Sequence, residues 1–142
     1  MRSMTQLILA GFLTIATTNA QTLVLVAGGG TGVNGDATNC RVHAPFGIDF
    51  DRAGNRYIVE MAGGERVLKI DTAGKLSVFA GTGEKGDNGD GGPALGARFN
   101  GMHSLAIGPG GDIFIADTWN NRIRRIEDGK IFAFAGTGEA RL

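Results

Sequence analysis

The chain has 142 residues, a formal net charge of zero, 25 glycines and only 3 prolines. This length fits one small domain. The balanced charge gives no general attraction to nucleic acid or to an anionic membrane, so neither is expected as a partner. The glycines follow no Gly-X-Y period, which excludes collagen, and their clusters between short apolar runs indicate many short strands.

The N-terminal residues 1–20 have the pattern of a secretory signal peptide. Arg2 supplies a positive charge, residues 7–16 are apolar, and Ala20 is a small residue that suits signal peptidase. The apolar run is too short to span a bilayer as a helix of the mature protein. A buried N-terminal strand or helix is the alternative. We expect a secreted or periplasmic protein without a membrane anchor, in which the single cysteine, Cys40, forms no intramolecular disulfide.

The rest of the chain contains an internal repeat. The string Ala-Gly-Thr-Gly-Glu occupies residues 80–84 and again 135–139, and a looser Gly-Thr-Gly occupies 30–32. Apolar runs and Gly, Asn or Asp turns recur in the same order between these markers. Four strands are predicted in each unit: 46–51, 56–60, 66–71 and 75–80 in the first, and 104–108, 112–117, 121–127 and 130–135 in the second. Four antiparallel strands in a unit of ~40–50 residues are typical of a β-propeller blade.

One more strand is expected ahead of the first unit. Residues 22–27 are apolar and lead into a Gly-Thr-Gly marker, as the last strand of each unit does. The predicted fold is therefore all-β: a β-propeller fragment with two four-stranded antiparallel blades, at about 46–80 and 104–135, plus an extra N-terminal outer strand. Closed propellers typically have four to eight blades, so two blades leave two apolar faces exposed. We expect the sequence to be part of a longer propeller; self-association through these faces is the alternative.

Residues 114–126 carry a family resemblance. Their sequence, Phe-Ile-Ala-Asp-Thr-Trp-Asn-Asn-Arg-Ile-Arg-Arg-Ile, resembles the core of the NHL repeat, and the glycine-rich run 88–94 is similar to a loop of secreted bacterial NHL proteins. The resemblance extends over residues 21–142 and is weaker in the first unit, where Glu60 replaces the aspartate. It implies a propeller, usually with six blades. It does not imply a function, because this fold hosts both binding platforms and enzymes.

The polar residues of the second unit are interpreted mainly as turn residues. Asp117, Asn120 and Asn121 have side chains that bond backbone groups in tight turns, and Arg122 is placed to pair with Asp117. We therefore predict that these four residues close a hairpin. Trp119, at the tip of the same turn, is a candidate stacking platform for a sugar or peptide, with packing on a neighbouring blade as the alternative.

The glycine-rich loop at 81–97 carries two weak calcium candidates, Asp87 and Asp90. A calcium loop places oxygen ligands at alternating positions, but Gly86 occupies one of them and no glutamate follows at the usual distance. The loop also lacks the Gly-Lys-Ser/Thr ending of a phosphate loop. An ordered connector is the preferred interpretation, and no cofactor is expected.

His103 begins the innermost strand of the second unit, at the position that Phe46 holds in the first. Inner strands line the central channel of a propeller, where ligands and metals bind. Residues 102–106 also resemble a segment of the peptidyl-hydroxyglycine lyase propellers, and that resemblance implies a histidine that helps to hold a catalytic zinc. Such a zinc needs three protein ligands, and His43 is the only other histidine. His103 is thus a metal ligand only under this alternative and otherwise a polar residue of the channel.

The sequence shows no recognisable catalytic serine or cysteine arrangement. We expect a non-enzymatic scaffold or binding module for a protein, peptide or glycan, with Phe46, His103 and Trp119 as the candidate binding residues. The alternative is part of a propeller enzyme, either a zinc-dependent lyase or a lactonase-like hydrolase, with His103 in the central channel.

Overall fold

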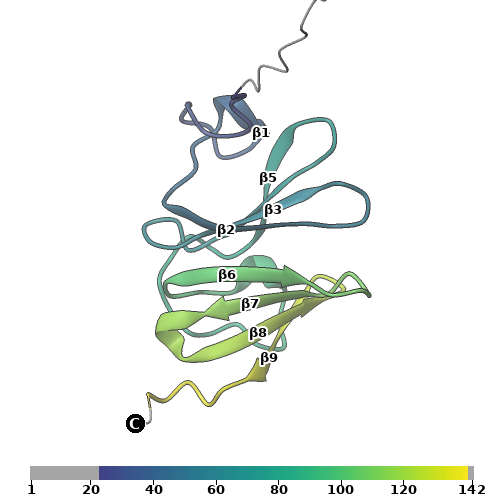
Figure 1. Cartoon of the computed structure of the whole chain (residues 1–142). Helices are drawn as coiled ribbons and strands as arrows, with labels where there is room; N and C mark the ends of the chain where they lie inside the picture. The colour runs from purple at the N-terminus through teal and green to yellow at the C-terminus, as the bar shows by residue number, and fades with distance from the viewer. Residues whose placement is uncertain (1–22, 141–142) are drawn as a thin grey trace, which may run out of the picture.

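The computed structural model describes residues 23–140, and the predicted signal peptide lies outside this range. These residues form two stacked antiparallel sheets (Figure 1). The first sheet has the order β1-β5-β4-β3-β2, with strands β1 (Gly35–Asp36), β2 (Pro45–Phe50), β3 (Arg56–Glu60), β4 (Val67–Ile70) and β5 (Lys75–Ala80). The second has the order β6-β7-β8-β9, with strands β6 (Met102–Ile107), β7 (Ile113–Asp117), β8 (Arg122–Glu127) and β9 (Lys130–Ala135).

The predicted fold of two four-stranded antiparallel blades is confirmed, since every predicted strand of the two units is present. Three short 3₁₀ turns accompany the strands: η1 (Ala37–Asn39), η2 (Ala94–Gly96) and η3 (Thr118–Asn120). None of the helical turns within residues 23–140 has the length or apolar character needed to cross a membrane.

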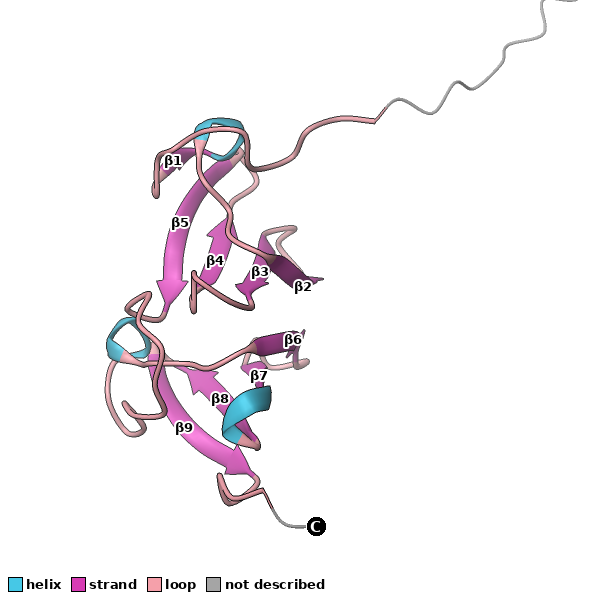
Figure 2. Cartoon of the chain, turned by 90° about the vertical axis from the view of Figure 1, so that its left-hand side faces the viewer, coloured by secondary structure: helices cyan, strands magenta, loops and turns pink. Residues whose placement is uncertain are grey.

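The two blades meet along their inner strands, β2 and β6, which run side by side (Figure 2). Gly47 permits this approach, because a Cβ atom there would lie 2.9 Å from the Cα atom of Ser104. Near the other end of β2, the Asp49 carboxylate accepts a hydrogen bond of 2.8 Å from the backbone N–H of Ile107. A glycine contact and a side-chain hydrogen bond thus fix the spacing of the two sheets.

Most of the core lies between the sheets. Tyr57, Val59 and Val67 of the first sheet face buried aliphatic residues of the second, including Ile115 and Ile126. Blades that bury both faces need apolar residues on both, which explains why the strands do not alternate cleanly between apolar and polar residues.

The long connector between the blades, residues 81–101, contributes to this core through Ala94, Ala97 and Phe99. The corresponding positions one repeat earlier are Ala37, Cys40 and Val42, which pack on the outer face of the first sheet. Residues 28–44 are therefore a shorter first copy of the connector, and Cys40 is buried as a small core residue.

The prediction of an extra strand at 22–27 is wrong for the residues that the structure describes. Residues 23–27 form no strand, and Leu23 is fully exposed. The outer edge of β5 is instead occupied by the two-residue strand β1, whose Gly35 pairs with Leu76. An apolar segment becomes a strand only beside a neighbour that exchanges backbone hydrogen bonds with it, and the described residues offer none there.

The outer face of the second blade remains uncovered by the described residues. Phe114 and Phe134 meet there edge to face, with ring centroids 4.9 Å apart, and Phe134 is 58% exposed. These two residues are the repeat equivalents of Tyr57 and Phe79, which make a similar edge contact at 5.1 Å against the inter-blade core. The exposed outer face of the second blade therefore has the same kind of aromatic pair as the face of the first blade that is buried between the blades.

Candidate ligand-binding site at the aromatic rim

The three predicted binding residues, Phe46, His103 and Trp119, lie together. The Phe46 and His103 rings meet edge to face with centroids 4.7 Å apart, and the His103 and Trp119 rings do so at 6.3 Å. Phe46 is 60% exposed and Trp119 is 48% exposed. We call these three residues the aromatic rim, because they cluster where the inner strands β2 and β6 begin.

Three different elements build the aromatic rim. Phe46 comes from β2, His103 from β6, and Trp119 from η3 between β7 and β8. Trp119 is held by a backbone hydrogen bond of 3.1 Å to the carbonyl oxygen of Asn100. Its indole packs on Gly101, where φ is +62° and where a Cβ atom would overlap the ring. A glycine is therefore required at this position both for the backbone conformation and for the close packing.

Two polar features belong to the aromatic rim. The Lys85 ammonium lies 5.6 Å from the centroid of the Trp119 ring, within the range of a cation–π interaction. The Nδ1 atom of His103 is buried and has no hydrogen-bond partner among the described residues.

The four predicted turn residues lie in and beside the η3 turn that carries Trp119. The Asp117 side chain is fully buried and accepts hydrogen bonds from the Asn100 backbone N–H at 2.8 Å and from Asn120 at 2.9 Å. Arg122 contacts the same carboxylate at 3.4 Å. Asn121 adopts a left-handed conformation, with φ of 50°, and turns the chain into β8. Asparagine tolerates this conformation better than most residues.

The structure adds a buried ion pair that the sequence did not predict, between Arg124 and Asp90. The Arg124 side chain is fully buried, and its Nε atom lies 2.9 Å from Asp90. The guanidinium also donates to the carbonyl oxygens of Arg98 at 2.7 Å and Asn88 at 3.1 Å, and it stacks 5.1 Å from the centre of the Phe99 ring. Burial lowers the pKa of Arg124, and the hydrogen bond and charge of Asp90 oppose that shift.

This ion pair ties the long connector to the second blade. One feature of the sequence indicates this ion pair. Arg124 occupies the repeat position at which the first blade has the buried Leu68, so a charged residue stands at a core position. A buried charge requires a partner, and the partner had to come from a loop long enough to reach it.

The two weak calcium candidates differ in their surroundings. Asp90 pairs with Arg124 at 2.8 Å and with Arg122 at 3.2 Å, so a cation at this carboxylate would meet two guanidinium groups. Asp87 accepts a hydrogen bond from Arg122 through its backbone carbonyl oxygen. This arrangement does not fit a calcium site.

The zinc alternative does not fit the residues around His103. Within residues 23–140, no three His, Cys, Asp or Glu side chains group closely enough to hold a metal ion. The other histidine, His43, lies beside Gly63 and donates its backbone N–H to Glu60 at 2.7 Å.

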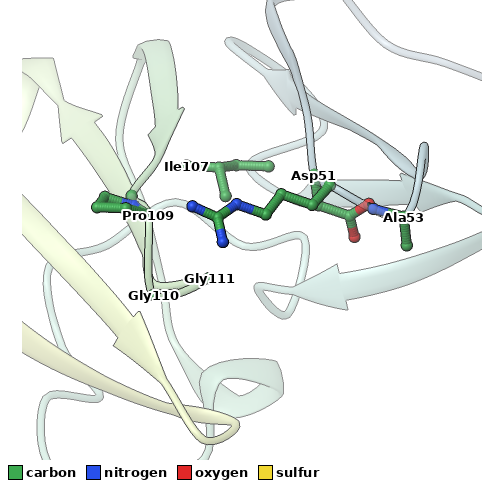
Figure 3. A pocket seen from close by; sticks show the side chains of 8 residues that line it. Asp51, Ala53, Ile107, Pro109, Gly110 and Gly111 are labelled. Atoms are coloured by element: carbon green, nitrogen blue, oxygen red, sulfur yellow. The ribbon is translucent and has the colours of Figure 1, made fainter.

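Two of the clefts lie at opposite ends of the strands. One, with a volume of about 310 Å³, lies at the opposite end from the aromatic rim, where Asp51 and Ala53 of one turn face Ile107 and Pro109 of the other (Figure 3). The Asp51 carboxylate is committed to its own turn through Asn55 at 2.7 Å. The other cleft, of about 210 Å³, borders Trp119 and extends the aromatic rim.

Comparison with known proteins finds a repeat-family match that overlaps the second blade. Residues 99–126 match the NHL repeat, whereas no curated protein matches the sequence. A solved Bacteroides thetaiotaomicron protein of unknown function is 28% identical, with a TM-score of 0.62 over 70% of this chain and 26% of that one. An auxiliary nutrient binding protein from the same organism is 25% identical, with a TM-score of 0.58 over 76% and 28%.

The chain therefore spans about a quarter of the length of the solved structures that it matches. The match to the NHL repeat confirms the resemblance that the sequence predicted.

Proposed function

Since the chain carries an NHL repeat within a β-propeller blade, we propose that it is a segment of a secreted, non-enzymatic binding propeller whose aromatic rim holds the ligand. The observation that carries the proposal is the convergence of Phe46, His103 and Trp119 from three elements onto one half-exposed surface. Aromatic residues of this kind dominate the energetics of binding surfaces. The similarity to an auxiliary nutrient binding protein adds weaker support.

The expected ligand is a protein, peptide or glycan, because each offers a face that stacks on exposed aromatic rings. The long connector supplies part of the surface next to Trp119, and loops at the ends of a rigid scaffold are where binding residues concentrate. In the proposed function, the blades act as the rigid scaffold and the aromatic rim supplies the contacts.

Secretion or export to the periplasm belongs to the same proposal and is supported by the signal-like pattern of residues 1–20. Self-association is also proposed, because the outer face of the second blade exposes Phe134. N-terminal sequencing of protein recovered from the medium or the periplasm tests the first point. A mature chain that begins after Ala20 is expected, and a chain that retains residues 1–20 would contradict it.

The test of the binding proposal is a comparison of three proteins on peptide and glycan arrays. The full chain is expected to bind a subset of probes, and the Phe46→Ala variant is expected to lose them. Phe50→Ala is the matched control, because Phe50 is 56% exposed at the other end of the same strand. Probes bound equally by all three proteins would place the binding surface elsewhere and overturn the proposal.

A further inference from the structure

The cleft beside Trp119 has an unusual balance of hydrogen-bonding groups. Its wall consists of these residues: Asp87, Trp119, Asn120, Arg122, Thr137, Gly138 and Glu139. They come from the long connector, from the η3 turn, from the start of β8 and from the segment that follows β9. The cleft and the aromatic rim share Trp119, so a ligand on the rim reaches the cleft without leaving the surface.

The amide of Asn120 and the guanidinium of Arg122, which line this cleft, are already engaged with the chain. The Asn120 amide donates to the carbonyl oxygen of Gly86 at 2.8 Å and to Asp117 at 2.9 Å. The Arg122 guanidinium contacts Asp117, Asp90 and the Asp87 carbonyl oxygen. The two carboxylates also balance the charge of Arg122. The other side-chain donors in the wall of the cleft are the Trp119 indole N–H and the Thr137 hydroxyl.

The cleft also offers an acceptor beside an aromatic face. The Asp87 carboxylate forms no hydrogen bond or ion pair with any residue in the described part of the chain. Thr137 accepts a hydrogen bond of 3.3 Å from the Glu139 backbone N–H. The Lys85 ammonium lies 5.6 Å from the indole centroid, so the Trp119 ring already carries a cation of the chain itself.

Given the binding function proposed above, on which this inference rests, we infer that the cleft takes the cationic side chain of a basic peptide. An ammonium or guanidinium group pairs with Asp87 and takes the position against the Trp119 ring that the Lys85 ammonium holds in the free chain. A neutral sugar is the poorer match, because it brings no charge to pair with the Asp87 carboxylate. The observations therefore favour a lysine- or arginine-containing peptide.

Trp119 is the only tryptophan of the chain, so its fluorescence reports on this cleft directly. The experiment titrates the full chain with a short arginine peptide and with the same peptide carrying citrulline, a neutral isostere of arginine. The arginine peptide is expected to change the emission and to bind roughly fivefold or more tightly than the citrulline peptide, a difference that shrinks at high salt.

The matched variants are Asp87→Asn and Glu84→Gln. Asp87→Asn removes the charge with little change in shape and is expected to abolish most of the preference for arginine. Glu84 is paired with Arg98 and does not line the cleft, so Glu84→Gln should keep the preference. Circular dichroism confirms that both variants are folded.

Each other outcome overturns the inference. Equal affinity for arginine and citrulline peptides, an unchanged preference in Asp87→Asn, or no saturable response to the arginine peptide would each do so. Failure of the inference is distinguishable from failure of the proposed function: array ligands that are lost in Phe46→Ala but retained in Asp87→Asn leave the aromatic rim as the binding site and exclude only the cationic side chain.

Discussion

At the scale of single residues, the most consequential contact is between Arg124 and Asp90. A buried guanidinium is stable only when its donors are satisfied, and Arg124 achieves this with Asp90 and two backbone carbonyl groups of the connector. The first blade has Leu68 at the equivalent position and a shorter connector. The charged pair and the longer loop thus occur together in the second blade.

Replacement of Arg124 by alanine is expected to lower the free energy of unfolding by about 3 kcal/mol, since it removes the buried hydrogen bonds of the guanidinium to Asp90 and to the carbonyl oxygens of Arg98 and Asn88. Urea denaturation at neutral pH measures this loss. Arg125→Ala is the control, because Arg125 is half-exposed and pairs with Asp112 at the surface; its loss should be below about 1 kcal/mol. Equal losses of unfolding free energy in the two variants would show that the buried ion pair stabilises the fold no more than the surface ion pair does.

At the scale of elements, the turns decide how the strands are arranged. Asp51 accepts hydrogen bonds from the backbone N–H groups of Ala53 at 3.0 Å and Asn55 at 2.9 Å, and so closes the β2–β3 turn. Between β8 and β9, Asp128 and Gly129 both have positive φ, the conformation that tight two-residue hairpins require. Gly, Asn and Asp are the residues that the repeat places between its apolar runs.

The Asp51 turn predicts an acid-dependent stability. The hydrogen bonds from Asn55 lower the pKa of Asp51 below 3.8, so the ionised carboxylate is favoured in the folded state. Its contribution is fully present above the unfolded-state pKa and is lost as pH falls through the lower folded-state pKa. The difference in unfolding free energy between the full chain and Asp51→Asn should therefore be constant near neutral pH and shrink below about pH 4. A constant difference down to pH 2 would contradict this account.

The fold was predictable from the sequence wherever local chemistry decides it. Glycine-rich turns at matching positions in two units were sufficient to predict eight strands and their antiparallel order. The segment at 22–27 was mispredicted because its apolar composition resembles that of a real strand, whereas strand formation depends on a neighbour that composition does not reveal.

The candidate site was predictable only in part. Phe46, His103 and Trp119 were each identified separately, but their convergence depends on the stacking of β2 on β6 and on the path of the η3 turn. The Arg124–Asp90 pair and the cleft beside Trp119 depend on how the connector folds back on the second blade. These are long-range contacts, and no local pattern encodes them.

At the scale of the whole molecule, the spacing of the blades depends on Gly47. A Cβ atom at this position would lie 2.9 Å from Ser104 and 3.1 Å from the carbonyl oxygen of His103, so Gly47→Ala must push the sheets apart. We expect a loss of about 1–3 kcal/mol in unfolding free energy, the usual cost of overpacking. Gly110→Ala is the control, because a Cβ atom there meets only open space and the edge of Asp112. Equal stability of the two variants would contradict the close contact of the blades.

The uncovered outer face of the second blade predicts concentration-dependent association of the chain. Phe134→Glu places a charge on that face and is expected to shift the solution mass toward the monomer, as measured by light scattering. Leu95→Glu is the matched control, since Leu95 is 57% exposed on η2, away from this face. An equal fall in solution mass in both variants would show that association does not depend on the outer face of the second blade.

The central claim is that the aromatic rim is where the ligand binds. Its most direct test is the emission of Trp119 during titration with a ligand selected on the arrays, alongside calorimetry of the same mixture. A saturable change in emission, with the dissociation constant found by calorimetry, is the predicted result. Binding that is measured by calorimetry while the emission of Trp119 stays unchanged would contradict the claim.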